Sequence, residues 1–146
     1  MKKGRDPKVT SRIMSSIRSK NTRPEIIFGK ILWKNNLRYR KHYAIAGKPD
    51  FVIVSSKLAV FVDGDFWHGN NWKLRGIKDL STELATYKKF WANKITNNIK
   101  RDQKANLILK KEGWKVFRFW ESGIKRKPET LLKKVLKAHH ARKPDV

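Results

Sequence analysis

The chain has 146 residues, and its 36 Lys and Arg against 12 Asp and Glu give a formal net charge of +24. Hydrophobic residues make up 39% of it and cysteine is absent, which excludes a disordered polycation, disulfides, a thiol nucleophile and thiolate metal sites. No apolar run reaches the ~18–20 residues of a membrane span, and the first residues lead into no hydrophobic signal segment. We therefore expect one domain over residues 1–146 with short basic tails, a cytoplasmic monomer without membrane contact whose partner is a nucleic acid.

The first third of the chain predicts two helices. Apolar residues share one face of a helix over about residues 10–19. The segment Thr22–Glu25 has the pattern of a capping box with Pro in the first turn, so a second helix begins there and ends near Asn35 and Asn36. A short basic strand over residues 37–40 follows.

The rest of the chain predicts three strands and two more helices. Apolar runs at 51–54 and 58–62 are typical of buried strands. The predicted elements after them are, in order, a loop over 69–82, a long helix over about 83–112 that Gly113 ends, a strand over 115–120 and a last helix around 131–136. This order of elements indicates an α/β fold.

Acidic residues gather at the ends of the two central strands. Asp50 precedes the first strand, Asp63 and Asp65 follow the second, and Lys57 is the one cation of this stretch, which has a net charge of −2. Neighbouring carboxylates repel each other unless a proton, a cationic side chain or a metal ion holds them, and hard oxygen ligands suit Mg²⁺ or Mn²⁺. Aspartate is also a common turn residue. The pattern favours a metal site, with simple turns as the alternative.

Phe66, Trp67 and His68 come directly after these acids. Aromatic side chains exposed beside a polyanion site can insert between bases, and a histidine can act as a general base near neutral pH. A buried aromatic pair and a hydrogen-bonded structural histidine explain the same residues equally well. Glu25 also has two possible roles. The capping box alone explains its position, but if the start of this helix packs on the sheet, its carboxylate would point at a metal.

Several ordered motifs between about residues 11 and 122 resemble those of the very-short-patch repair (Vsr) endonucleases. They are Ser19–Glu25, Leu37–Arg40, Gly47–Phe51, Val60–Gly69, Phe90–Ile95, Asn98–Asp102, Gly113–Val116 and Trp120–Glu121. The resemblance implies a restriction-endonuclease-like fold, with a central mixed sheet flanked by helices. It also implies Mg²⁺-dependent nicking of one DNA strand on the 5′ side of the thymine in a T·G mismatch, the lesion left by deamination of 5-methylcytosine.

The resemblance implies a role for each candidate site residue. Asp50 would be the carboxylate ligand of the metal, and Val62 would supply a backbone carbonyl to it. His68 would activate the attacking water. Asp63 would lie just outside the direct ligands, and Glu25 would hold a metal-bound water.

The same resemblance implies that Phe66, Trp67 and Trp91 enter the duplex at the mismatch, because a mispaired step costs less to unstack than a matched one. The implied partner is double-stranded DNA with a T·G mismatch, and mismatch-repair proteins are candidate further partners. Two alternatives stay open: a restriction-like nuclease of the same fold with another DNA substrate, and a non-catalytic basic DNA-binding protein. The intact Asp50 and His68 count against the second alternative.

One departure from the family pattern concerns zinc. Members usually carry a structural zinc site of cysteines and histidine, which begins at the position of Asp65 and ends just past Glu121. At those places this chain has Asp65, Asn70, Asn71, Trp72 and Ser122. We therefore expect no structural zinc, with packing or polar contacts in its place, and Asp65 becomes a candidate second metal ligand.

Overall fold

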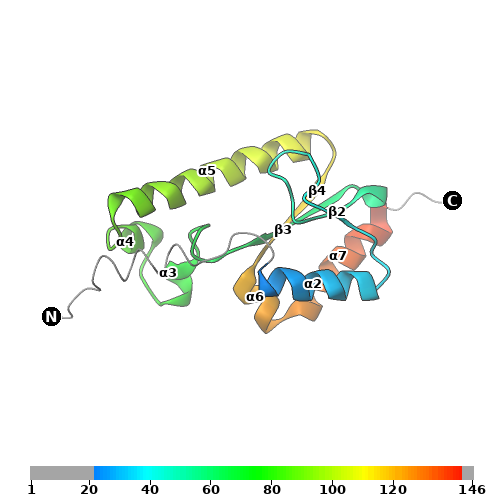
Figure 1. Cartoon of the computed structure of the whole chain (residues 1–146), viewed down its shortest axis with the longest axis horizontal. Helices are drawn as coiled ribbons and strands as arrows, with labels where there is room; N and C mark the ends of the chain where they lie inside the picture. The colour runs from blue at the N-terminus through cyan, green and yellow to red at the C-terminus, as the bar shows by residue number, and fades with distance from the viewer. Residues whose placement is uncertain (1–21, 143–146) are drawn as a thin grey trace.

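A four-stranded mixed sheet forms the centre of the computed structural model, which describes residues 22–142 (Figure 1). The strands are β1 (Arg40–Lys41), β2 (Phe51–Ile53), β3 (Leu58–Asp63) and β4 (Lys115–Trp120), and they lie side by side in this order. β2 is antiparallel to both of its neighbours, and β4 is parallel to β3. The predicted helix over about residues 10–19 lies outside the described residues.

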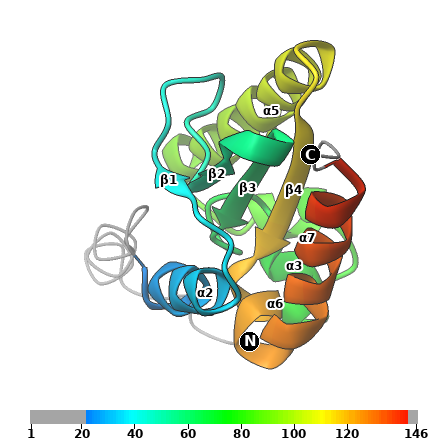
Figure 2. The ribbon, with the colours of Figure 1, turned by 90° about the vertical axis from the view of Figure 1, so that its right-hand side faces the viewer.

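Helices cover both faces of the sheet. They are α5 (Lys89–Lys111) on one face, and α2 (Arg23–Lys34), α6 (Glu121–Arg126) and α7 (Pro128–Arg142) on the other (Figures 1 and 2). All of β3 is buried, and its side chains alternate between the two layers. Leu58, Val60 and Val62 join the core cluster that contains residues of α2 and α7, whereas Ala59 and Phe61 pack with a residue of α5. The predicted α/β class is confirmed.

Helix α2 begins where its sequence pattern predicts. The side chain of Thr22 accepts a hydrogen bond from the backbone N–H of Glu25 at 3.4 Å, and Pro24 occupies the first turn. The helix buries Phe28 and Leu32 completely. It ends at Lys34 with Asn35 as its C-cap, close to the predicted end near Asn35 and Asn36. The predicted strand over 37–40 is shifted, because pairing with β2 begins only at Arg40.

The segment predicted as a loop over 69–82 contains two short helices, α3 (Asn71–Leu74) and α4 (Leu80–Leu84). Asp79 caps α4, because its carboxylate accepts a hydrogen bond from the backbone N–H of Thr82 at 2.8 Å. The sequence pattern predicts a long helix from about Glu83, but α5 begins only at Lys89. Glu83 is buried, and its side chain accepts a hydrogen bond from the hydroxyl of Tyr87, which fixes the turn between the two helices.

The C-terminal elements match the prediction with one addition. Gly113 has φ +89° and follows the end of α5, a left-handed conformation that glycine adopts at low cost. β4 and α7 occupy the predicted segments. Between them lies α6, whose six residues are too few to show a helical period in the sequence. None of the described helices has the length and apolar content needed to cross a membrane.

Candidate active site

The register of the two central strands brings the predicted carboxylates together. β2 and β3 are antiparallel, with Phe51 opposite Val60, so Asp50 at the head of β2 lies beside the end of β3. The backbone N–H of Val62 donates a hydrogen bond to Oδ2 of Asp50 at 2.6 Å. Asp63 is the last residue of β3 and is buried. A cavity of about 250 Å³ opens here, and its lining includes His42, Asp50, Val62, Asp63, His68, Asp102 and Arg118.

The electrostatics at Asp50 favour a bound proton or cation. Burial raises the pKa of this carboxyl to about 7, against an ordinary value of 3.8. The charges of Glu25 and Asp63 raise this pKa as well, while the hydrogen bond from Val62 and the charge of Lys41 lower it. A carboxylate of this kind could hold a metal ion, whose charge would take the place of the proton's.

Glu25 joins Asp50 from the first turn of α2. Its side chain is 2% exposed, and its Oε1 lies 3.0 Å from Nζ of Lys41 and 3.8 Å from Nε2 of His42. Ligand atoms of Glu25, His42 and Asp50 all lie within 4.8 Å of one another, so these three residues could hold a metal ion. Sequence reasoning missed His42, which follows β1 with φ +49° and has no neighbouring motif that would single it out.

His68 belongs to a second group of residues that lines the same cavity. Its Nδ1 is hydrogen-bonded to Oδ2 of Asp102, and it is 3.8 Å from Oδ1 of Asp63. Arg118 contacts both acids: its Nη1 lies 3.0 Å from Oδ1 of Asp63 and 3.4 Å from Oδ1 of Asp102. Sequence reasoning gave no role to Asp102 or Arg118. The available signals were that Asp102 is the one acid of the basic helix α5, and that Arg118 is a cation inside an otherwise apolar part of β4.

The two acids and the arginine set the charge state of His68. Burial lowers the pKa of His68, but the hydrogen bond that His68 donates to Asp102 and the charges of Asp63 and Asp102 raise it by more, so the net pKa is above its ordinary value. The charge of Arg118 opposes this rise. Burial also raises the pKa of Asp63, and His68 and Arg118 counteract the rise. An imidazole with one ring nitrogen held by a carboxylate can accept a proton at the other.

Asp65 lies apart from both groups. Its Oδ1 accepts hydrogen bonds from the side chains of Asn70 and Ser122, each at 2.8 Å, and its Oδ2 accepts one from the backbone N–H of Ser122 at 3.0 Å. These three residues, which we call the polar clamp, occupy positions at which the resemblance implies zinc ligands. The clamp ties the segment after β3 to the start of α6. Ligation of a metal by Asp65 stays a prediction.

The predicted inserting aromatics form one cluster beside the cavity. Phe66 contacts Trp67, and Trp67 contacts Trp91 at a ring distance of 5.7 Å. Trp67 is buried, at 9% exposure, and Nζ of Lys94 of α5 lies 4.8 Å from the centre of its ring, so the structure agrees with the buried-aromatic alternative for this residue. The exposed ring of the cluster is that of Phe90, at 67%. Phe90 contacts Trp91 edge to face and was predicted only as part of a helix.

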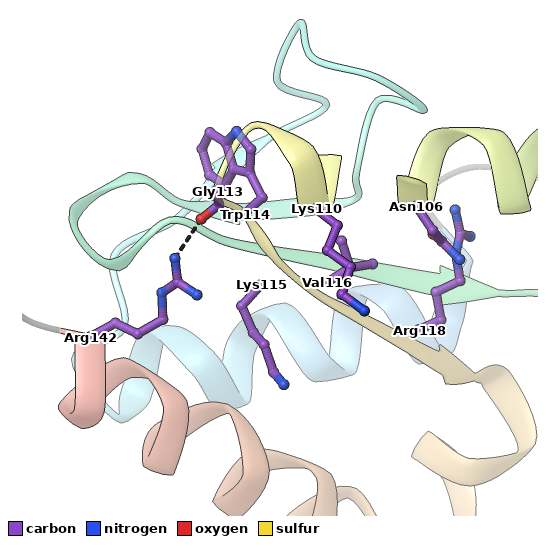
Figure 3. A pocket seen from close by; sticks show the side chains of 8 residues that line it. All are labelled: Asn106, Lys110, Gly113, Trp114, Lys115, Val116, Arg118 and Arg142. Atoms are coloured by element: carbon purple, nitrogen blue, oxygen red, sulfur yellow. Dashed lines mark hydrogen bonds between the residues drawn. The ribbon is translucent and has the colours of Figure 1, made fainter. Parts of the chain in front are cut away.

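A second cavity, of about 490 Å³, lies along the outer side of β4 between α5 and α7 (Figure 3). Its lining is basic and includes Lys110, Lys115, Arg118 and Arg142, with no carboxylate among the residues that line it. Arg142 is held in place there by hydrogen bonds to the backbone oxygens of Ser56 and Gly113. The smaller cavity is therefore the one with the groups for hydrolytic chemistry.

Comparisons with known proteins agree with this site. The sequence model of the family described as DNA mismatch endonuclease Vsr matches residues 4–74. The Type II nicking enzyme V.NmeDIP of Neisseria meningitidis serogroup C is 41% identical over 133 residues, covering 90% of this chain and 86% of that protein. The Type II nicking enzyme V.HpaIIP of Haemophilus parainfluenzae is 39% identical over 129 residues, with 88% of each chain covered.

The DNA mismatch endonuclease Vsr of Escherichia coli (strain K12) is 30% identical over 121 residues, covering 82% of this chain and 74% of that protein. The mixed sheet flanked by helices is the restriction-endonuclease-like arrangement expected for such a protein. Coverage of this extent, together with the family match and the acidic cavity, establishes a DNA endonuclease. The chain belongs to the Vsr family of DNA mismatch endonucleases.

Proposed function

We propose that this endonuclease nicks one strand of duplex DNA on the 5′ side of the thymine in a T·G mismatch and that it requires Mg²⁺. The observation that carries the proposal is the pairing of His68 with Asp102 in the same cavity as Asp50. The relatives named as nicking enzymes and the Escherichia coli mismatch endonuclease support the choice of substrate and product. The formal net charge of +24 supports binding to a phosphate backbone.

The acidic side of the cavity fits a hard divalent cation. Asp50 would hold the ion together with the backbone carbonyl of Val62, and Glu25 and His42 lie close enough to bind it or its water. Carboxylate and carbonyl oxygens suit Mg²⁺, and the burial and neighbouring carboxylates that raise the pKa of Asp50 would also favour a cation beside it. When bound, such an ion would polarise the scissile phosphate and stabilise the charge that develops on it.

His68 would act as the general base. In the neutral imidazole, Nδ1 carries the proton and donates a hydrogen bond to Asp102. Nε2 is then unprotonated and can accept a proton from the attacking water. The new bond forms between the water oxygen and phosphorus, the bond from phosphorus to the leaving sugar oxygen breaks, and that oxygen takes a proton from solvent. Lys48, which lines the same cavity, would contact the phosphate through its charge.

Mismatch preference would come from the aromatic cluster of Phe66, Trp67, Phe90 and Trp91. A ring that enters the duplex gains stacking of about 1–3 kcal/mol per base, and a T·G step opens at lower cost than a matched step. Phe90 is the most exposed ring of the cluster, so it would meet the duplex first. Phe66, Trp67 and Trp91 lie behind it and would follow through a shift of side chains.

The deciding experiment is a single-turnover nicking assay with Mg²⁺ on otherwise identical T·G and T·A duplexes, each labelled on either strand. We expect a single nick 5′ of the thymine in the T·G duplex and none in the T·A duplex. The Asp50→Asn variant serves as the inactive control. Equal cleavage of both duplexes would contradict mismatch specificity and favour a restriction-like nuclease, whereas binding without cleavage would favour a non-catalytic protein.

A further inference from the structure

Arg118 reaches the catalytic cavity from the edge strand β4 and is held by several contacts at once. Its Nη1 donates hydrogen bonds to both carboxylate oxygens of Asp63, at 3.0 and 3.2 Å. Its Nη2 donates to the backbone oxygen of Asp102 at 3.4 Å, and its Nε donates to Oδ1 of Asn106 at 2.6 Å. The guanidinium also lies 3.8 Å from the centre of the ring of Phe61. This side chain therefore has one well-defined orientation.

The acids that Arg118 contacts are the two that face His68. Asp63 comes from β3 and Asp102 from α5, and both lie within 4 Å of Nδ1 of His68. The other charged or titratable residues that line the cavity are His42, Lys48 and Asp50. The two acids alone would place two negative charges beside the imidazole, whereas with Arg118 the net charge of the three residues is −1. A single net negative charge is what orients a catalytic histidine without keeping it protonated.

We propose that Arg118 is a positioning residue, which fixes the carboxylates of Asp63 and Asp102 around His68 and neutralises one of them, so that the imidazole is free to accept a proton. The proposal rests on the proposed role of His68 as general base and extends it to a residue that acts on His68 through Asp63 and Asp102. The role requires the planar fork of a guanidinium, because three of its nitrogens donate in three directions.

The proposal predicts two separable effects of replacing Arg118. Arg118→Met removes the charge and the fork, so the pKa of His68 rises and the limb of the pH–rate profile that reports this group moves to higher pH. Each unit of this shift lowers the rate at neutral pH about tenfold, and the rate recovers as the pH is raised. Arg118→Lys keeps the charge, so the pH profile moves less, while the maximal rate falls because the carboxylates are held less firmly.

The experiment combines two measurements on the full chain. The first is the pKa of the His68 imidazole, obtained by NMR titration in a chelator and without DNA. The second is the pH dependence of single-turnover nicking of the T·G duplex with Mg²⁺. Lys115→Met is the matched control, because Lys115 is an exposed cation of the same strand, and it should leave both measurements unchanged.

Removing Arg118 alone leaves Asp63 buried without its partner, so a double variant protects the test against misfolding. Arg118→Met with Asp63→Asn restores a net charge of −1 beside His68, and we expect its pKa to return toward the wild-type value. An unchanged pKa of His68 in every variant, or a loss of rate in Arg118→Met that is the same at every pH, would overturn the proposal. If the wild-type chain fails to nick a T·G duplex, the proposed function fails, while the NMR titration still decides the role of Arg118.

Discussion

Asp50→Asn should abolish nicking and at the same time stabilise the fold at alkaline pH. The change is nearly isosteric, and the amide oxygen of Asn can still accept the hydrogen bond from the backbone N–H of Val62. It removes a negative charge that is partly buried beside Glu25 and Asp63. Binding of DNA should be unchanged or tighter, because one source of repulsion toward phosphate is lost.

The size of the stabilisation follows from proton linkage. The pKa of Asp50 is about 7 in the fold against an ordinary value of 3.8. Between these values the folded protein holds a proton that the unfolded chain has released, so the free energy of unfolding of the wild type falls by about 1.36 kcal/mol per pH unit as the pH rises. From about pH 5.5 to about pH 7 this amounts to about 2 kcal/mol, and above pH 7 both states are ionised and the difference stays constant.

The assay is urea unfolding of wild type and variant in a chelator, followed by tryptophan fluorescence, at about pH 5.5 and about pH 8. The stability of Asp50→Asn relative to the wild type should grow by about 2 kcal/mol between the two conditions. Asp79→Asn is the control: a hydrogen bond from Thr82 lowers the pKa of this exposed carboxyl, so it is ionised at both pH values and its effect should not change. A stability difference for Asp50→Asn that is equal at both pH values would refute the reasoning.

Three further predictions concern the site and its surroundings. His68→Ala should lower the single-turnover nicking rate about 10²–10⁴-fold, the usual contribution of a general base, and a loss below about threefold would return His68 to a structural role. Trp91→Ala should weaken binding to a T·G duplex by about 1–3 kcal/mol in a competition titration at fixed salt, with little change for a T·A duplex, and the exposed Leu107→Ala on the same helix is the control. Trp67 is less suitable because it is buried, so its replacement by Ala also removes core packing. Elemental analysis should find no stoichiometric zinc, and a strong chelator should leave the urea midpoint unchanged; one zinc per chain would contradict this.

The parts of the fold that sequence patterns predict are those set by local chemistry. The start of α2 depends on Thr22 and Pro24, and the end of α5 on Gly113, so neighbouring residues suffice to predict both. The break between α4 and α5 is different. It depends on the contact of a buried Glu83 with Tyr87, and the helical pattern continues across it.

Some residues of the candidate site are likewise predictable from neighbouring residues, and others are not. Asp50 comes before one apolar strand and Asp63 ends the next, and antiparallel pairing brings the start of one strand beside the end of the other. The partners of His68 come from distant segments: Asp102 is 34 residues away in the chain. Arg118 is 55 residues from Asp63. Only the parallel pairing of β4 with β3, and the packing of α5 across them, bring these side chains together.

Helix α5 carries both an aromatic ring of the cluster and the acid that is hydrogen-bonded to His68. Trp91 and Asp102 are eleven positions apart in the sequence. At 3.6 residues per turn this is about three turns, so both side chains project from one face of the helix, about 16 Å apart along its axis. The side chain of Asn98, on the turn between them, donates a hydrogen bond to the backbone oxygen of Trp67 at 3.1 Å. A rigid helix cannot slide at one end only, so any axial displacement of Trp91 by an entering duplex would displace Asp102 by the same amount and change the alignment of His68.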